Sequence, residues 1–484
     1  MDKINFINQP TSIIIVTSVS LVFVLIGLIY SKKHQGLNNY LTANRSIGFY
    51  SLTTSLVASA LGAWILFGPA SAATWGGIGA VIGYALGTAF PMIFLIFLGK
   101  KVRNEFPKGS TLIEFLRKRF RKSLFKLILL MSIFYMFIFL CAEVTAVAML
   151  INYISGTPFW ITALIILITT LTYTLYGGLR ASIITDTIQS VIIIILLLIS
   201  AIYLITNIGD KFTFDFVNKN NSHLLSSSYI PNYTAGLTFF IAVAATNLFH
   251  QGNWQRVYAA KNNKVLKKSL IVSFMAIVPI VLFMGFSGLV AISIDPKVIP
   301  DLGFFSLLLK DQSEILSLVI VVLGLSLTIS TVDTLVNAIS SLVIVDTKAT
   351  FNLKSKKNYF KLSKYFIIII SIISFIVASK GFSVLYLFLL ADLLCCAFVV
   401  AVFYSFYNKL LNEKIAYFSI IMGLILGLLF FPAPDFSKSL LVGIIVPMEI
   451  FPAFVSQSLL FLSFLIATLV PAIVIMTNDS IKRR

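Results

Sequence analysis

The sequence predicts an all-α polytopic membrane protein. The chain has 484 residues, of which 58% are hydrophobic and only 11% are charged, and its mean hydropathy is +0.98. Apolar runs of about 20 residues, which is enough to cross a bilayer, recur along the whole chain. Basic residues also gather in alternate connections between these runs. A soluble globular protein does not show this pattern, so the lipid bilayer is the expected environment.

About thirteen transmembrane helices are expected from the apolar runs. Their approximate ranges are 12–30, 50–74, 78–99, 124–152, 159–177, 181–206, 234–251, 269–293, 314–345, 364–379, 382–407, 415–432 and 455–476. The first run is too long for a secretory signal peptide and lacks the usual small-residue cleavage site, so it is expected to remain as a helix. The connections are short, and no soluble domain is expected.

The distribution of charge predicts the orientation in the membrane. The basic connections contain Lys32, Lys33, Arg45, residues 100–126, 256–268 and 348–364, Lys409, Lys414 and the final Lys-Arg-Arg, whereas the other connections mix acids with bases. The positive-inside rule places the basic set in the cytoplasm. The protein is then expected in the plasma membrane, with its N-terminus outside the cell and its C-terminus in the cytoplasm. The net charge of +19 therefore reflects topology and contact with anionic lipid, and no nucleic-acid partner is expected.

The sequence offers little support for an enzyme. It contains no HExxH motif and no recognisable pair of protease aspartates. Its three cysteines, Cys141, Cys395 and Cys396, fall within predicted spans, where they are expected to pack rather than to form disulfides or to bind zinc. Neither a transition metal nor an organic cofactor is expected.

Four acids fall deep within predicted spans: Glu143, Asp186, Asp333 and Asp392. No Lys or Arg is expected to lie equally deep. An ionisable side chain at mid-membrane costs roughly 2.5–3.5 kcal/mol on insertion scales, so such residues are functional candidates. The surplus of negative charge should be balanced by a proton, a metal cation or a cationic substrate.

A polar stripe runs along the predicted helix 314–345. Ser326, Ser330, Asp333, Asn337 and Ser340 follow the spacing i, i+4, i+7, i+11 and i+14, which places them on one helix face. The hydroxyls alone could bond to their own helix or to neighbouring helices, but an aspartate in the same stripe indicates a functional role. Oxygen ligands at close range suit a hard cation such as sodium.

A second source of oxygen ligands is a broken helix, because a break frees backbone carbonyls. The run SLVASALGAWILFGPASAATWGGIG, from residue 55 to 79, is the best candidate, with Gly62, Gly68 and Pro69 among many alanines and serines. Close packing of helices is the alternative explanation for these small residues.

At this point the sequence resembles the solute:sodium symporter family. The segment YGGLRASIITDTIQ, from Tyr176 to Gln189, is similar to a family signature in which a Gly-Gly turn precedes a helix bearing Thr-Asp and Gln. ASALGAW (58–64) and LTIST (327–331) resemble the family's first and eighth core helices. The resemblance implies a LeuT-type fold of two inverted five-helix repeats, 50–206 and 234–407, with an extra N-terminal helix at 12–30 and two C-terminal helices within 415–476.

The resemblance also implies two cation sites. The sodium site would use the carbonyls of Ala58, Leu61 and Leu327 and the hydroxyls of Ser330 and Thr331. A second cation site would use Asp186, Ser330, Asp333 and Thr334. Relatives have a hydroxyl residue where Asp333 stands, a departure that would strengthen cation binding or create a proton site. Candidate solute contacts are Trp64, Phe67, Ser71, Glu143, Ala244, Asn247 and Asp392.

The expected function is sodium-coupled symport of a small polar organic solute into the cell by alternating access. The sequence leaves open whether the solute is an amino acid, urea or an amine, and whether the coupling ion is sodium or a proton. The alternatives are an uncoupled carrier and a transporter-like sensor that acts through a partner. The segment FHQGNWQRVYAAK, from Phe249 to Lys261, resembles a Q..WQR..A.K segment of several family branches and is interpreted as part of a cytoplasmic gate or as an interfacial anchor.

Overall fold

The computed structural model describes residues 6–33, 36–120, 122–311, 313–347, 356–408, 411–447 and 450–483. Of the basic stretch 348–364 that is expected in the cytoplasm, residues 348–355 lie outside the described residues. Lys409 also lies outside them. Within the described ranges the protein is helical, with two isolated β-bridges and no named strand. The main helices are α1 (Gln9–Lys33), α3 (Phe49–Ala60), α4 (Gly68–Glu105), α6 (Lys122–Ser155), α7 (Phe159–Ile208), α9 (Ile230–Phe249), α11 (Asn263–Ile294), α13 (Glu314–Val345), α14 (Lys356–Ala378), α15 (Val384–Tyr404), α16 (Glu413–Phe430) and α19 (Leu459–Arg483).

Shorter helices join these elements. They are α2 (Leu37–Thr42), α5 (Leu112–Arg119), α8 (Phe214–Asn221), α10 (Gln251–Ala259), α12 (Gly303–Leu308), α17 (Val442–Ile445) and α18 (Ala453–Gln457), with 3₁₀ turns η1 (Ala43–Arg45), η2 (Ala63–Leu66), η3 (Gly209–Lys211), η4 (Ser222–Leu225) and η5 (Pro300–Leu302). The all-α polytopic class is therefore confirmed.

Ten helices of the described chain are long and apolar enough to cross a membrane. Two of them, α4 and α7, each contain a glycine with left-handed backbone, Gly77 (φ 60°) and Gly178 (φ 60°), which divides the helix where the sequence predicted two spans. The predicted span 50–74 is spread over α3, η2 and the start of α4. The count of thirteen transmembrane helices remains a prediction, and the division of α4 and α7 at these glycines supports it.

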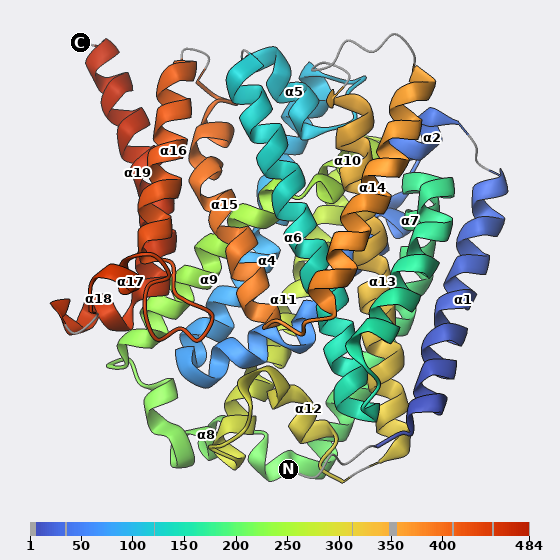
Figure 1. Ribbon diagram of the computed structural model, residues 1–484, viewed down its shortest axis with the longest axis vertical. Coiled ribbons are helices and arrows are strands. Elements are labelled where there is room, and N and C mark those ends of the chain that lie inside the picture. The colour runs from blue at the N-terminus through green and yellow to red at the C-terminus, as the bar shows by residue number, and fades with distance from the viewer. Residues whose placement is uncertain are drawn as a thin grey trace.

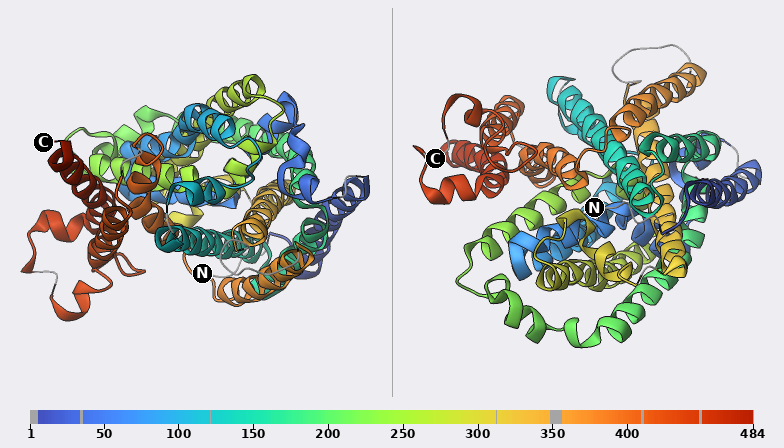
Figure 2. Two further views of the ribbon diagram at one scale, coloured as in Figure 1. Left: turned by 90° about the horizontal axis from the view of Figure 1, so that it is seen from above. Right: turned by 60° about the horizontal axis from the view of Figure 1, so that its bottom comes forward.

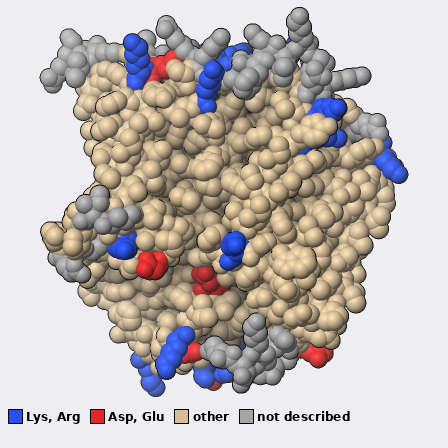
Figure 3. All heavy atoms as spheres, viewed as in Figure 1, with Lys and Arg blue, Asp and Glu red and all other residues tan. Residues whose placement is uncertain are grey.

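The helices run between two ends of the molecule (Figure 1). The start of α1 lies at the lower end, where α8 and α12 also lie, and the end of α19 lies at the upper end, where α2 and α5 also lie. The connections predicted to be basic thus share one end, and the mixed connections share the other. Figure 3 shows charged side chains gathered towards the two ends, with a broad uncharged surface above the lower third.

The interior is built by close contact between backbones. Helix α4 packs along α9 and α11, as the views in Figure 2 also show. A Cβ atom added at Gly79 or Gly83 would lie 1.7 Å from the carbonyl oxygen of Asn232 or 2.0 Å from that of Gly236. Glycines spaced by four residues on α4 therefore let α9 approach closely. The three cysteines are buried and free, as expected.

Candidate functional site

The first core helix is broken at mid-length. Helix α3 ends at Ala60, the backbone of Leu61 is non-helical (φ −103°, ψ 76°), and a regular helix resumes at Gly68 after η2. The carbonyls of Ala58 and Leu61 accept no hydrogen bond from any described residue. A helix end leaves its last carbonyls unsatisfied, and both residues are buried, so the break leaves two free carbonyl oxygens at positions where the resemblance implied sodium ligands.

Glu143 supports the break. Its Oε2 accepts a hydrogen bond of 2.9 Å from the Ala63 backbone N–H, and the side chain is fully buried. Only glycine fits at position 62, because a Cβ there would lie 2.2 Å from Glu143 Oε1. In this structure Glu143 therefore contacts the backbone of the break and does not line the pocket described below.

The polar stripe of α13 faces the same region. Helix α13 packs against both α3 and η2, and Thr331 lines a pocket together with Ser59 and Ala60 of the break. The Thr331 hydroxyl donates to the Leu327 carbonyl at 3.1 Å, which leaves the hydroxyl oxygen for another partner. The Leu327 carbonyl lies within the α13 helix and accepts this bond in addition to its helical one, so it would have to give up the hydroxyl before it could bind an ion. The predicted sodium ligands are thus brought to one region, and their oxygen chemistry fits a hard monovalent cation.

The second predicted group also assembles, with one addition. Ser330 and Ser55 donate to the Asp186 carboxylate at 2.6 Å each. Arg256 of α10 forms an ion pair with Asp186 at 2.6 Å, with both side chains fully buried, and donates to the Thr334 hydroxyl at 2.9 Å. The expectation that no basic side chain lies as deep as the four acids is therefore wrong.

The reason for this error is a second break. Helix α9 ends at Phe249, and His250 has non-helical backbone (φ −57°, ψ 107°) before α10 begins. This break brings α10 into contact with α3, α4 and α13, so that Trp254 and Arg256 are fully buried. The sequence contained one signal for this ion pair: Asp186 lies deep in a predicted span without a basic partner, and Arg256 was available to balance it. Interpreting 249–261 as an interfacial anchor placed Arg256 at the membrane surface instead.

Asp333 is held by hydroxyl groups alone. Its Oδ2 accepts from Tyr173 at 2.7 Å and from Thr185 at 3.2 Å, and its Oδ1 accepts from Ser182 at 2.7 Å. Asp333 has no ion-pair partner among the described residues. When both carboxyl groups are ionised, Asp186, Asp333 and Arg256 therefore leave one buried negative charge that is not balanced.

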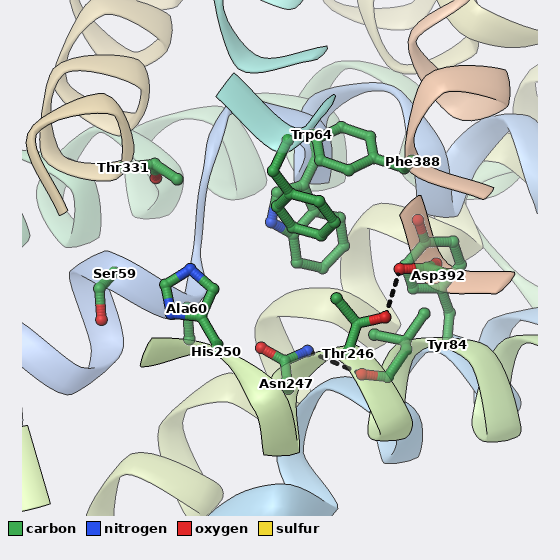
Figure 4. A pocket seen from close by; sticks show the side chains of 12 residues that line it. Ser59, Ala60, Trp64, Tyr84, Thr246, Asn247, His250, Thr331, Phe388 and Asp392 are labelled. Carbon is green, nitrogen blue, oxygen red and sulfur yellow. Dashed lines mark hydrogen bonds between the residues drawn. The ribbon is translucent and has the colours of Figure 1, made fainter. Parts of the chain in front are cut away.

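A small pocket lies beside the break (Figure 4). Its lining comes from α3, η2, α4, α6, α9, α13, α15 and His250: Ser59, Ala60, Trp64, Tyr84, Phe139, Val243, Thr246, Asn247, His250, Thr331, Phe388 and Asp392. Of the predicted solute contacts, Trp64, Asn247 and Asp392 line it, whereas Phe67, Ser71, Ala244 and Glu143 do not. The sequence did not identify Tyr84, Phe139, Thr246, His250 or Phe388. The cavity volume in this structure is about 30 Å³, which is enough for water, so an organic solute can enter only when the lining side chains move apart.

Phe67 and Ser71 lie behind the pocket. The Phe67 ring packs at 5.1 Å on the ring of Phe305, and both Phe67 and Ser71 are buried. Ala244 is buried on α9, the helix that also carries the pocket residues Thr246 and Asn247.

Paired broken helices beside a small central pocket are typical of a class of secondary transporters with a LeuT-type fold, in which ion and solute meet at the breaks. A model of the sodium:solute symporter family matches residues 40–423, and the chain belongs to that family. Its family and relatives are transporters, not enzymes.

Two relatives illustrate the similarity in sequence. The chain is 26% identical over 381 residues to the spermidine transporter DUR31 of Candida albicans, an alignment that covers 78% of this chain and 71% of that protein. It is 30% identical over 191 residues to the sodium/glucose cotransporter 1 of Ovis aries, which covers 38% of this chain and 28% of that protein.

Two solved structures show the fold. The substrate-bound outward-open state of a Na⁺-coupled sialic acid symporter matches with a TM-score of 0.76 at 18% identity and covers 97% of both chains. The structure of MhsT in complex with L-phenylalanine matches with a TM-score of 0.53 at 15% identity and covers 89% of this chain and 98% of that one.

Proposed function

We propose that this protein is a secondary active transporter that uses sodium to import a small polar organic solute by alternating access. The observation that carries the proposal is the pair of buried, unbonded carbonyls at Ala58 and Leu61, in a break whose flanking elements α3 and η2 pack against α13. Sodium bound between them is the coupling ion and is itself transported, with Leu327, Ser330 and Thr331 as its further ligands.

The site explains how ion and solute are coupled. Ser59, Ala60 and Thr331 border the pocket, so an ion that joins the break to α13 also shapes the solute site. By thermodynamic reciprocity, each then raises the affinity of the other. One charge moved across 100 mV supplies about 2.3 kcal/mol, which is enough to drive a useful solute gradient. The movement itself is a rocking of the bundle of the first, second, sixth and seventh core helices, which come from both five-helix repeats, against the remaining helices.

We propose one further cation at Asp333, because Asp186, Asp333 and Arg256 together carry one unbalanced negative charge. Arg256 is the partner of Asp186 in this structure, so the charges of the second site of Asp186, Ser330, Asp333 and Thr334 are balanced by a single monovalent cation, either sodium or a proton. Proton coupling is the alternative to sodium at this position.

The solute class includes amino acids, urea and amines. The similarity to a spermidine transporter over 78% of the chain favours an amine, as does the acidic residue Asp392 in the pocket. A monocarboxylate is the least favoured solute, because it would bring a like charge into a site that is already negative.

The orientation is proposed from charge. The end of the molecule that contains α2, α5 and the end of α19 (Figure 1) carries most of the basic connections, so it is placed in the cytoplasm of a cell whose plasma membrane contains the protein. The N-terminus is then outside.

The test is uptake into proteoliposomes. Radiolabelled spermidine, urea and alanine are each offered under an inward sodium gradient, with equal sodium on both sides, and with potassium replacing sodium. The proposal predicts that at least one solute accumulates above equilibrium only under the sodium gradient. Replacing Ser330 and Thr331 together with Ala should abolish this accumulation.

The alternatives give different results. Flux that reaches equilibrium but ignores sodium indicates an uncoupled carrier. Solute binding without any flux indicates a sensor that acts through a partner protein. Either result overturns the proposed symport.

A further inference from the structure

We infer that Asp392 is the counter-ion for a positively charged amine of the solute, which makes the transported solute an organic cation. The inference deepens the proposed function and rests on it only for the claim that the pocket binds the transported solute. Its support comes from the hydrogen bonds of Asp392, the rings around it and the opposite end of the pocket.

The Asp392 carboxylate lacks a partner for its charge. Its Oδ1 accepts a hydrogen bond of 2.7 Å from Thr246, and no described residue bonds to the other oxygen or forms an ion pair with the side chain. The residue is 4% exposed and lines the pocket. A buried carboxylate that keeps one free oxygen towards a cavity is suited to receive a cation there.

The ligand set at Asp392 does not suit a metal ion. Sodium and other hard cations take several oxygen ligands, whereas the oxygens of the described pocket residues near Asp392 in Figure 4 are those of Thr246 and Tyr84. Rings form much of the remaining lining, including Trp64, Tyr84 and Phe388. An ammonium group needs fewer oxygen partners and is stabilised over ring faces.

Three of the aromatic rings, those of Trp64, Tyr84 and Phe239, stack on one another and form what we call the aromatic wall. Trp64 stacks on Tyr84 with centroids 5.3 Å apart and planes 13° apart, and Tyr84 stacks on Phe239 at 4.8 Å and 19°. Phe388 meets Phe139 edge to face at 4.7 Å. Aromatic faces beside a desolvated cation add an attraction of about 2 kcal/mol or more in other proteins, so the wall and the carboxylate favour the same ligand charge.

The opposite end of the pocket has an unused polar group. His250 Nδ1 is buried and has no hydrogen-bond partner among the described residues, and the side chain is 5% exposed. Figure 4 shows His250 and Asp392 on opposite sides of the space, with Asn247 and Thr246 between them. A solute with an ammonium group at one end and a hydrogen-bonding group at the other satisfies both residues.

The test measures binding to the purified full chain. Three probes of equal length, 1,4-diaminobutane, 4-amino-1-butanol and 1,4-butanediol, are compared by thermal shift in sodium and in potassium, since a ligand that binds the folded state raises Tm. We expect both amines, but not the diol, to stabilise the protein. Asp392→Asn should lower amine affinity by about tenfold to a hundredfold, as expected for the loss of a charge-assisted hydrogen bond, and Asp392→Glu should retain part of it.

Two controls make the result specific. Asp435→Asn removes an acid that is fully exposed and should leave amine binding unchanged. The Tm shift caused by sodium alone should persist in Asp392→Asn, which shows that the variant is folded and that its sodium site is intact.

The outcomes separate this inference from the proposed symport. Amine binding that survives in Asp392→Asn, equal stabilisation by the diol, or no stabilisation by any amine in either salt overturns the role of Asp392. Amine binding that requires Asp392 but is the same in sodium and potassium supports that role and contradicts sodium coupling.

Discussion

At the scale of single residues, the buried ion pair of Arg256 and Asp186 is the feature that most constrains the account. Both side chains are fully buried. Each guanidinium nitrogen and each carboxylate oxygen has a hydrogen-bond partner, from within the pair or from Ser55, Ser330, Thr334 or the Gly252 carbonyl. A buried pair of this kind is weak support for stability as such, but removing one partner leaves an uncompensated charge.

Replacing Arg256 with Gln should therefore destabilise the protein by about 3–5 kcal/mol, because Asp186 then remains charged and unpaired. The double variant Arg256→Gln with Asp186→Asn should recover most of this loss. Unfolding of the purified protein by heat or denaturant measures both effects.

The control is the exposed pair of Lys101 and Glu105, whose nitrogen and oxygen lie 3.5 Å apart with i, i+4 spacing. Breaking it by Lys101→Gln should cost about 0.5 kcal/mol or less. If breaking the buried pair and breaking the exposed pair lowered the free energy of unfolding by the same amount, the stabilising role of the buried network would be contradicted.

Replacing Asp333 tests whether a bound cation balances the negative charge of its carboxylate. Changing it to Asn or Ser removes the one unbalanced negative charge, so the cation that balances it should be lost. If that cation is sodium, the sodium-activation curve of uptake should become less steep, and if it is a proton, the dependence of uptake on pH should disappear. An Asp333→Asn protein in which both properties are unchanged would refute the second cation.

At the scale of elements, the proposed sodium site depends on the break between α3 and η2. Ala58 and Leu61 supply carbonyls only because the chain leaves the helix, and Glu143 satisfies one of the donors that the break exposes. The break therefore depends on a contact between α6 and the first core helix.

Gly62→Ala should disturb this element, since its Cβ would lie 2.2 Å from Glu143 Oε1. We expect the apparent affinity for sodium to fall by at least tenfold, which corresponds to about 1.4 kcal/mol of binding free energy. Titrating Tm with sodium measures this affinity.

Gly48→Ala is the matched control, because a Cβ at Gly48 meets nothing within 4 Å. It precedes the same helix, so it should leave the sodium titration nearly unchanged. A Gly62→Ala protein with the sodium affinity of the wild type would show that the break does not hold the ion.

The elements also show what a sequence can predict. Apolar runs, small residues and the polar stripe predicted the long helices, the first break and the inward face of α13, because each depends on local composition. The burial of Arg256 and the position of His250 depend on the second break, after Phe249, which no glycine or proline marks at that point. The aromatic wall joins Trp64, Tyr84 and Phe239 from η2, α4 and α9, a tertiary arrangement without a sequence signal.

At the scale of the whole molecule, the two broken helices, the stripe and the pocket meet within one bundle, and the basic connections share one end of it (Figure 1). In the function that we propose, this arrangement joins an oxygen-rich site for sodium to a pocket for the solute. The membrane potential would then act on the ion, and Ser59, Ala60 and Thr331, which line the pocket, would link ion binding to solute binding.

Equilibrium binding of radioactive sodium to the purified protein tests this account most directly. The account predicts saturable binding to the wild type and the loss of at least one bound sodium in the protein with Ser330→Ala and Thr331→Ala, while the Gly48→Ala protein binds as the wild type does. Equal sodium binding in the double variant and the wild type would contradict the assignment of the coupling ion to the broken helix and the α13 stripe.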